Sequence, residues 1–484
     1  MPTDVSTAAV TGKSLNDQQD TGESQGGLAR LAYGFTQWAE KWFPDAFVFV
    51  ILTTLVVTIA DLAIGAAPLE IASGFGSGFW SLIPFTLQMA MVAITGYVVA
   101  SSPPCTRLIA KLASVPASGP QAVAWVAFVS MGASYLNWAL SLVLGGLLVR
   151  ALARRVDLHM DYRAASAAAY LGLGSTWALG LSSSAAMLQA NPLSLPKSIS
   201  DISGVIPLSD TIFLWQSVVL YFALMIMSIL VFYFAAPRGR HVKTAADMGV
   251  DVTSELTTDQ KPTRPGDWFE FTPVLPILIV LLAVGYFWSQ FAEKGLLATV
   301  SSLNNYNFFF LMLGLLLHRN IRSFLVAVSK AVPTATGVLI QFPFYGAIAA
   351  MLTHVVGSDG VSISHHLSAL FVSIANGDTF PVVIGIYSAV LGFLVPSGGG
   401  KWIIEAPYVL QAAQDMQAHM GWAVQVYNAA EALPNLINPF WMLPLLGIVK
   451  LQARDIVGFT FTQLLFSAPV VMFLLWFFAQ TLSP

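Results

Sequence analysis

Long apolar stretches recur along this chain from residue 43 to residue 480. About 20 apolar residues in a helix are enough to cross the hydrocarbon core of a bilayer. Uninterrupted stretches of this kind cover residues 43–65, 76–100, 162–182, 211–236, 269–292, 304–318, 330–355, 422–447 and 455–480. Only 10% of the residues are charged, against about 25% in ordinary soluble domains. The sequence therefore predicts an all-α polytopic membrane protein that lies in a lipid bilayer.

Two further apolar stretches, 120–150 and 379–412, are too long for a single span and carry a polar or Gly-rich break in the middle. Basic residues flank the membrane mainly on the cytoplasmic side. They cluster at 150–163, 238–264, 319–330 and 450–454. All these clusters lie on the cytoplasmic side only if each long stretch enters the membrane and returns on the same side. We expect nine crossings and two re-entrant hairpins, with a cytoplasmic N-terminus and a periplasmic C-terminus.

The two halves share an order of elements that predicts an inverted repeat. Ile83-Pro84-Phe85 in one half and Phe342-Pro343-Phe344 in the other precede an amphipathic stretch, a hairpin, a broken helix and a plain apolar helix. Each element starts on the opposite side from its partner, as in many secondary transporters. The expected organisation is a disordered cytoplasmic tail (1–40), a first repeat (41–236), a cytoplasmic linker (237–268), and a linking helix with the second, inverted repeat (269–484).

Two of four polar breaks are the hairpin tips. Irregular backbone at membrane depth is tolerated only where it is buried in protein or lines a cavity, so each break is a candidate binding position. The first tip, Ser134–Trp138, contains Asn137, and the alternative is a capped turn buried in protein. The second tip, Pro396–Gly400, has three glycines whose N–H groups can converge on an anion at a helix N-terminus. Its alternative is a plain glycine-rich turn.

The other two breaks interrupt predicted spans. Residues 174–184 carry hydroxyls that can coordinate a cation or donate to a carboxylate, although such hydroxyls also bond to their own helix backbone. Residues 431–439 contain two prolines and two asparagines, which free carbonyls and add amides to a cavity. Glu431 can carry a proton or bind a cation. Lys401 and Glu405, four residues apart on one helix, can form an ion pair.

These breaks give the predicted site residues. The substrate-binding candidates are Asn137, Thr176, Ser183, Ser397, Gly398, Gly399, Gly400, Asn435 and Asn438. The coupling-ion candidates are Asn137, Ser182, Glu431 and Asn438. A single cysteine, histidines without ligand spacing and the absence of a nucleotide-binding motif argue against a metal site, ATP-driven transport, an enzyme and a nucleic-acid partner. The one cofactor expected is Na+ or H+ as a coupling ion, and a homo-oligomer is left open.

Several motifs resemble one known family, the short-chain fatty acid transporters (the acetoacetate/butyrate permease family), over residues 30–480. They are Lys41-Trp42-Phe43-Pro44-Asp45, residues 78–91, Gln341-Phe342-Pro343-Phe344-Tyr345, Asp378-Thr379-Phe380-Pro381, Val395-Pro396-Ser397-Gly398-Gly399-Gly400 and Pro439-Phe440-Trp441. The resemblance implies a fold of the wider ion-transporter superfamily and symport of butyrate- or acetoacetate-like monocarboxylates into a bacterium across its inner membrane. It also supports a substrate site at Asn137 and the second tip. The alternatives are a carrier or exchanger for another small organic anion such as a dicarboxylate, a passive channel, and an intramembrane enzyme.

Overall fold

The computed structural model describes residues 46–192, 195–252, 263–394 and 398–483. Within these ranges the regular secondary structure is helical, apart from one isolated bridge between Val356 and Ser362. The predicted all-α class is therefore confirmed. The polar N-terminal tail and Ser397 of the second tip, which the sequence analysis singled out, lie outside the described residues.

The helices of the first half run up to the polar linker. They are α2 (Ala46–Ala63), α3 (Pro68–Ser81), α4 (Ile83–Ala100), α5 (Pro103–Ala113), α6 (Gly119–Leu136), α7 (Trp138–Ala153), α8 (Tyr162–Leu171), α9 (Ser184–Gln189), α10 (Lys197–Ser203) and α11 (Trp215–Ala235). Those of the second half are α12 (Asp267–Phe271), α13 (Val274–Ser301), α14 (Leu303–His318), α15 (Ile321–Ala331), α16 (Thr336–His354), α17 (Ile363–Ile374), α18 (Phe380–Leu394), α19 (Gly398–Asp415), α20 (Met420–Asn435), α21 (Pro439–Val449) and α22 (Ala453–Ala479).

Several helices are built to cross a membrane. Among the described residues, five segments are long and apolar enough: Ile83–Ala100, Trp215–Ala235, Val274–Leu296, Ile321–His354 and Ala453–Ala479. Large apolar side chains also face outward, for example Leu282 at 72% and Trp288 at 77% exposure on α13, which suits lipid and not water. The chain is thus a multi-pass membrane protein, while the count of nine crossings stays a prediction.

One predicted span is wrong. Residues 76–100 do not form one helix, because α3 ends at Ser81 and α4 begins at Ile83, with Leu82 between them. Pro84 explains the break, since its ring clashes with the carbonyl four residues earlier and it has no N–H to donate. By contrast, α16 continues through Pro343. The prolines of the two halves therefore act differently.

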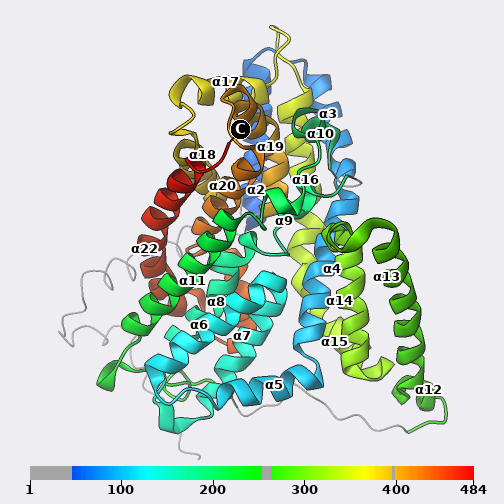
Figure 1. Cartoon of the computed structure of the whole chain (residues 1–484), viewed down its shortest axis with the longest axis vertical. Helices are drawn as coiled ribbons and strands as arrows, with labels where there is room; N and C mark the ends of the chain where they lie inside the picture. The colour runs from blue at the N-terminus through cyan, green and yellow to red at the C-terminus, as the bar shows by residue number, and fades with distance from the viewer. Residues whose placement is uncertain (1–45, 193–194, 253–262, 395–397, 484) are drawn as a thin grey trace, which may run out of the picture.

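The two long apolar stretches form helix–turn–helix hairpins. The first consists of α6 and α7, which meet at Asn137. The second consists of α18 and α19, on either side of residues 395–397. Figure 1 shows α6 and α7 in the lower half of the molecule and α18 and α19 in the upper half. The two hairpins therefore lie toward opposite ends of the bundle.

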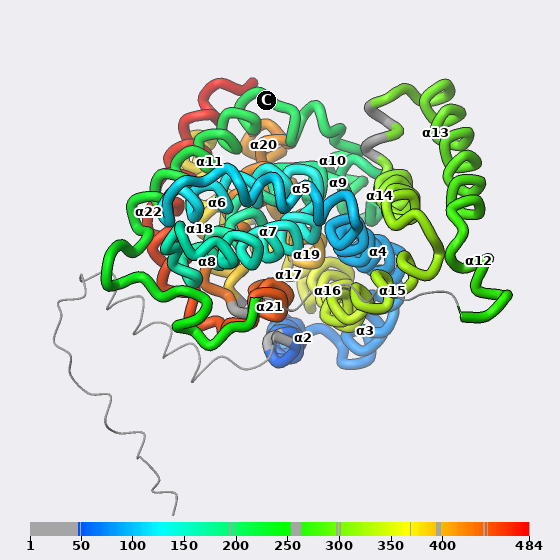
Figure 2. Tube along the Cα trace, turned by 90° about the horizontal axis from the view of Figure 1, so that it is seen from below, coloured from blue at the N-terminus to red at the C-terminus, as the bar shows by residue number. Residues whose placement is uncertain are grey.

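The broken helices and both hairpins form the centre of the bundle. Helix α6 packs on α7, α8 and α11, and α20 packs on α18, α19 and α22. A second group contains α2, α3, α4, α14 and α16, and it contacts the first group where α4 meets α7 and where α16 meets α19. Figure 2 shows α13 at the outer edge, beyond α14. The polar breaks therefore lie deep in the protein, away from the lipid-facing helices.

Candidate functional site

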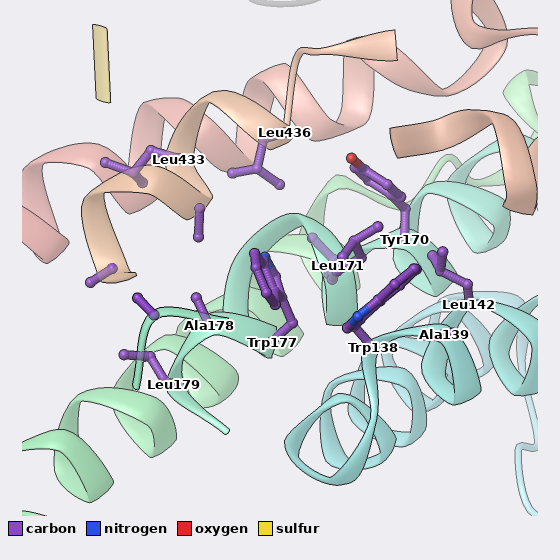
Figure 3. Packing of buried hydrophobic residues seen from close by; sticks show 14 of the residues in the cluster. Trp138, Ala139, Leu142, Tyr170, Leu171, Trp177, Ala178, Leu179, Leu433 and Leu436 are labelled. Atoms are coloured by element: carbon purple, nitrogen blue, oxygen red, sulfur yellow. The ribbon is translucent and has the colours of Figure 1, made fainter. Parts of the chain in front are cut away.

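The segment after α8 lies between the two hairpin tips. Beyond Leu171 the chain widens into a π-helical turn (Gly172–Thr176) and then tightens into a 3-10 turn (Trp177–Leu179). Leu181 donates its N–H to the carbonyl of Tyr135 in the first hairpin at 2.7 Å. Figure 3 shows the ring of Trp177 beside that of Trp138 of the first hairpin, with Leu436 at the end of α20 above it in this view. This irregular segment thus joins the first tip to the second half.

The second tip touches the same segment through its glycines. A Cβ at Gly398 would overlap the Trp177 ring, and one at Gly399 would lie 2.7 Å from Cε1 of Phe85 and 3.0 Å from Cβ of Ser184. The tip can approach this closely only because it has no side chains there. Gly398–Gly400 are the first described residues of α19, and the N-terminal end of a helix attracts negative charge.

The first tip is closed by its own hydrogen bonds. Oδ1 of Asn137 accepts from the N–H groups of Ala139 and Leu140 at 2.8 and 2.9 Å, which makes Asn137 the N-cap of α7. Its Nδ2 donates to the carbonyl of Val92 at 3.4 Å. The N–H of Trp138 donates to Oγ of Ser182 at 3.0 Å. The polar atoms of this side chain are therefore used inside the protein.

Three other predicted residues are also hydrogen-bonded. The hydroxyl of Thr176 lies 3.0 Å from that of Ser134. Ser183 caps α9 and donates to Oδ1 of Asn428 at 3.1 Å. Nδ2 of Asn438 donates to the carbonyl of Phe393, in the first arm of the second hairpin, at 3.4 Å. All lie near the tips, and their role in binding stays a prediction.

One face of α20 carries buried polar groups without partners. Both carboxylate oxygens of Glu431 and both amide atoms of Asn435 find no hydrogen-bond partner among the described residues, and the same holds for Nε1 of Trp177. We call Glu431, Asn435 and Trp177 the unpaired cluster. Buried polar atoms are nearly always satisfied, so each exception requires an explanation.

The unpaired cluster lies against the second tip. Oε2 of Glu431 is 3.5 Å from the position that a Cβ on Gly398 would take, where the ring of Trp177 also lies. Tyr427, one turn before Glu431, donates to the carbonyl of Gly398 at 2.6 Å. The backbone carbonyl of Asn435 accepts from the hydroxyl of Tyr170 on α8 at 2.8 Å. Gly398, Glu431, Trp177 and Tyr427 thus meet at one point, and Asn435 lies one helical turn beyond Glu431.

A buried ion pair lies on the α19 side of this point. Nζ of Lys401 is 2.9 Å from Oε1 of Glu405, and both side chains are fully buried. Lys401 also donates to the carbonyl of Ser388 at 2.9 Å and lies 4.3 Å from the ring centroid of Tyr427. The hydroxyl of Ser388 donates to the other oxygen of Glu405. The predicted pair is confirmed, and the two charges compensate each other within the second hairpin.

Sequence comparison identifies the family. A family model described as short chain fatty acid transporter matches residues 27–478. The chain belongs to the short-chain fatty acid transporter family. Proteins of Escherichia coli (strain K12) and Haemophilus influenzae, each named "Putative short-chain fatty acid transporter", are 33% and 32% identical to it. These matches cover 92% and 93% of this chain and 98% and 100% of the two relatives. The predicted family is therefore confirmed.

Solved structures share the fold of this family member. The YdaH transporter of Alcanivorax borkumensis is 14% identical with a TM-score of 0.57, and the match covers 90% of this chain and 98% of that one. MtrF of Neisseria gonorrhoeae, described within a class of antimetabolite efflux pumps, is 13% identical with the same TM-score and covers 92% and 97%. At this identity the likeness concerns the fold alone.

Some residues at the centre of this short-chain fatty acid transporter were missed by sequence reasoning. Trp177 stands inside the predicted break at 174–184, but only hydroxyl-bearing residues of that break were selected. Tyr427 precedes Glu431 by one helical turn, and that spacing places both on one face. Phe85 follows Pro84 at the start of α4. An aromatic residue beside a polar break was the available signal in each instance.

The point where these groups meet is closed to solvent. Gly398, Glu431 and Asn435 are buried. Two surface cavities, of about 200 and 440 Å³, are lined by other residues; the larger one includes Lys197, His354 and Tyr408. In the described part of the chain, no three His, Cys, Asp or Glu side chains gather as a metal site. In the described part of the chain, the unpaired cluster is therefore enclosed by protein, and a solute reaches it only if the bundle moves.

Proposed function

We infer that the protein is a secondary active transporter that takes up short-chain monocarboxylates, such as butyrate and acetoacetate, across a bacterial inner membrane with H+ or Na+. The unpaired cluster carries this proposal. The amide of Asn435 and the indole N–H of Trp177 are donors without acceptors among the described residues. Trp177 lies against Gly398 of α19, and Asn435 follows Glu431 by one turn of α20. A carboxylate supplies the missing acceptors at a position where the helix terminus favours negative charge.

The surroundings suit a short alkyl chain with one charge. The rings of Trp177 and Phe85 and the side chain of Leu436 lie close to the glycine tip and the π-helical turn, and they provide apolar contact. A second carboxylate on the substrate would require a second cation. Lys401 is the buried cation on this side, and Glu405 already compensates it at 2.9 Å. Charge balance therefore favours a monocarboxylate over a dicarboxylate.

Burial favours a carrier over the other classes. A channel needs a continuous path, whereas the groups around Gly398 are enclosed by protein. An enzyme needs a nucleophile with a base or a bound metal, and Ser183 and Ser182 are engaged in capping and in a backbone hydrogen bond. Opposed hairpins and broken helices are the parts from which alternating-access transporters are built. The same logic supports the inverted repeat as an interpretation.

The distribution of charge supports the proposed orientation. Figure 1 shows α5, α12 and the turn between α14 and α15 at one end of the molecule, and the C-terminus at the other. Arg107, Arg264 and Arg319 belong to these segments. Positive charge marks the cytoplasmic side, so the C-terminal end of α22 is assigned to the periplasm.

Uptake into proteoliposomes tests the proposal. Labelled butyrate and acetoacetate are offered with an imposed H+ or Na+ gradient, and protein-free liposomes correct for diffusion of the neutral acids through lipid. We expect protein-dependent accumulation with one of the two gradients. Asn435→Ala serves as the matched variant and should abolish most of it. If no short acid accumulates beyond the protein-free control with either gradient, the proposed function is wrong.

A further inference from the structure

The carboxylate of Glu431 is the one component of the unpaired cluster that does not suit an anion site. An ionised carboxylate only accepts hydrogen bonds, and this one lies beside the same helix N-terminus that we assign to the substrate. Two carboxylates at close range in a buried site cannot both ionise without a large cost, so one of them holds a proton. Only a positive charge close to Glu431 could relieve this repulsion.

The neighbouring elements offer no free cation. On α19, Lys401 and Glu405 act on Glu431 with opposite signs and are already joined at 2.9 Å. On α18, Tyr387 bonds to Tyr408 of α19 at 3.0 Å.

The remaining elements that pack on α20 add only neutral groups near Glu431. Tyr170 of α8 and Tyr427 of α20 itself are close enough to sense its charge. The segment 172–179 and α9 have no titratable side chain, and α22 carries Arg454 and Asp455 in its first turn.

A proton is the ion that a lone carboxylate can hold without further ligands. Hard metal cations require several oxygen ligands, and in the described part of the chain Glu431 belongs to no group of three or more His, Cys, Asp or Glu side chains that could hold one. A protonated Glu431 gains an O–H donor. It then adds a third donor to those of Asn435 and Trp177, which the proposed function assigns to the substrate carboxylate.

We propose that Glu431 is the proton-coupling residue and that the monocarboxylate binds only when Glu431 is protonated. This rests on the proposed function, because it assigns the coupling ion of the same site. One H+ enters with one anion, so net transport moves no charge. The loaded site holds a proton and an anion and the empty site holds ionised Glu431, so both states carry the same net charge through the bundle. The Lys401–Glu405 pair stays internally compensated throughout.

Proton uptake on binding tests the inference with the full-length protein in detergent. Butyrate is titrated into weakly buffered protein that contains a pH indicator, at several pH values at which butyrate is ionised. Above the titration range of Glu431, the wild type should take up about one proton per bound anion, and its Kd should rise about tenfold per pH unit. Glu431→Gln, which mimics the protonated side chain, should bind butyrate without proton uptake and with a Kd independent of pH.

Two variants keep the result interpretable. Glu293→Gln makes the same change on exposed α13 and should behave as the wild type. Glu431→Asp retains a titratable group and should retain proton uptake. Binding by the wild type without proton uptake, proton uptake by Glu431→Gln, or a Kd that responds to NaCl against KCl and not to pH would each overturn the inference while leaving the transported anion in place. A wild type that binds no short acid at any pH overturns the proposed function itself.

Discussion

The described residues at the two hairpin tips differ in how their buried polar side chains are hydrogen-bonded. At the first tip, Asn137 uses its oxygen to cap α7 and its amide nitrogen to bond to α4. At the second tip, Gly398 lies close to Oε2 of Glu431. The side chains of Glu431 and of Asn435, one turn further along α20, have no hydrogen-bond partners among the described residues. A satisfied tip rigidifies the protein, whereas unsatisfied groups are retained at a cost in stability. Under the proposed function, this difference favours a structural role for the first tip and substrate binding at the second.

The largest expected effect concerns the charges in the second hairpin. The corresponding first-hairpin helices, α6 and α7, contain no acidic residue, so only the second tip depends on a buried ion pair. Lys401→Met leaves Glu405 buried without its cation, which should destabilise the protein by about 3–5 kcal/mol. The thermal unfolding midpoint of the purified protein in detergent measures this.

Two companions show whether the pair causes that loss. Lys401→Met combined with Glu405→Gln removes both charges and should recover much of the stability. Lys294→Met, on exposed α13, should change stability by less than about 0.5 kcal/mol. If the double variant is no more stable than Lys401→Met alone, the uncompensated charge of Glu405 is not the cause of the lost stability.

A smaller effect is expected from filling the contact at the second tip. In Gly398→Ala, the new methyl group overlaps the Trp177 ring, so the tip must move away from the 3-10 turn Trp177–Leu179 at a cost of about 1–3 kcal/mol. Butyrate binding should fall with it, because the unpaired cluster is assembled by this contact. Calorimetric titration and the unfolding midpoint report the two quantities.

Gly132→Ala is the matched control in the first hairpin. A Cβ at that helical position meets nothing within 4 Å, and alanine is a better helix former than glycine, by about 0.5–1 kcal/mol. Stability should therefore stay the same or rise, with binding unchanged. Equal losses of stability and of butyrate binding in both variants would show that the two tips respond alike, which would contradict the proposed difference between them.

How much of this could be read from the sequence differs between the two tips. The polar breaks, both hairpins and the Lys401–Glu405 pair follow from local composition and from helical spacing. The role of Asn137 also had a local signal, because an asparagine directly before a helix is a preferred N-cap. The absence of a hydrogen-bond partner for Asn435 had no such local signal. Its lack of a partner depends on α8 and α19, which are distant in sequence and adjacent only after folding.

Proline had to be judged in its tertiary context as well. Pro84 ends α3 and starts α4, whereas Pro343 lies inside an uninterrupted α16. The residues around the two prolines are alike. The uninterrupted apolar stretch over 76–100 predicts a single span there. The intrinsic preference of proline for a helix start applies to Pro84. At Pro343, packing of α16 against α2, α3 and α19 supports a continuous helix despite the lost hydrogen bond.

The sharpest test of the comparison exchanges the two asparagines for alanine. Asn137→Ala removes an N-cap and should cost about 1–2 kcal/mol of stability, with little effect on the affinity for butyrate in the protein that remains folded. Asn435→Ala removes two buried polar atoms that have no hydrogen-bond partner among the described residues. Stability should therefore stay the same or rise. Its affinity for butyrate should fall about tenfold or more, since a hydrogen bond to a charged group contributes about 1.5–3 kcal/mol.

The two variants are a matched pair because each loses the same amide from a fully buried position beside a hairpin tip. Unfolding midpoints should rank Asn435→Ala above Asn137→Ala, and butyrate affinities should rank them in the reverse order. A loss of stability in Asn435→Ala as large as that in Asn137→Ala would mean that the amide already has a partner in the empty protein. The donors at the second tip would then be occupied before the substrate arrives, and the anion site would have to lie elsewhere among the breaks.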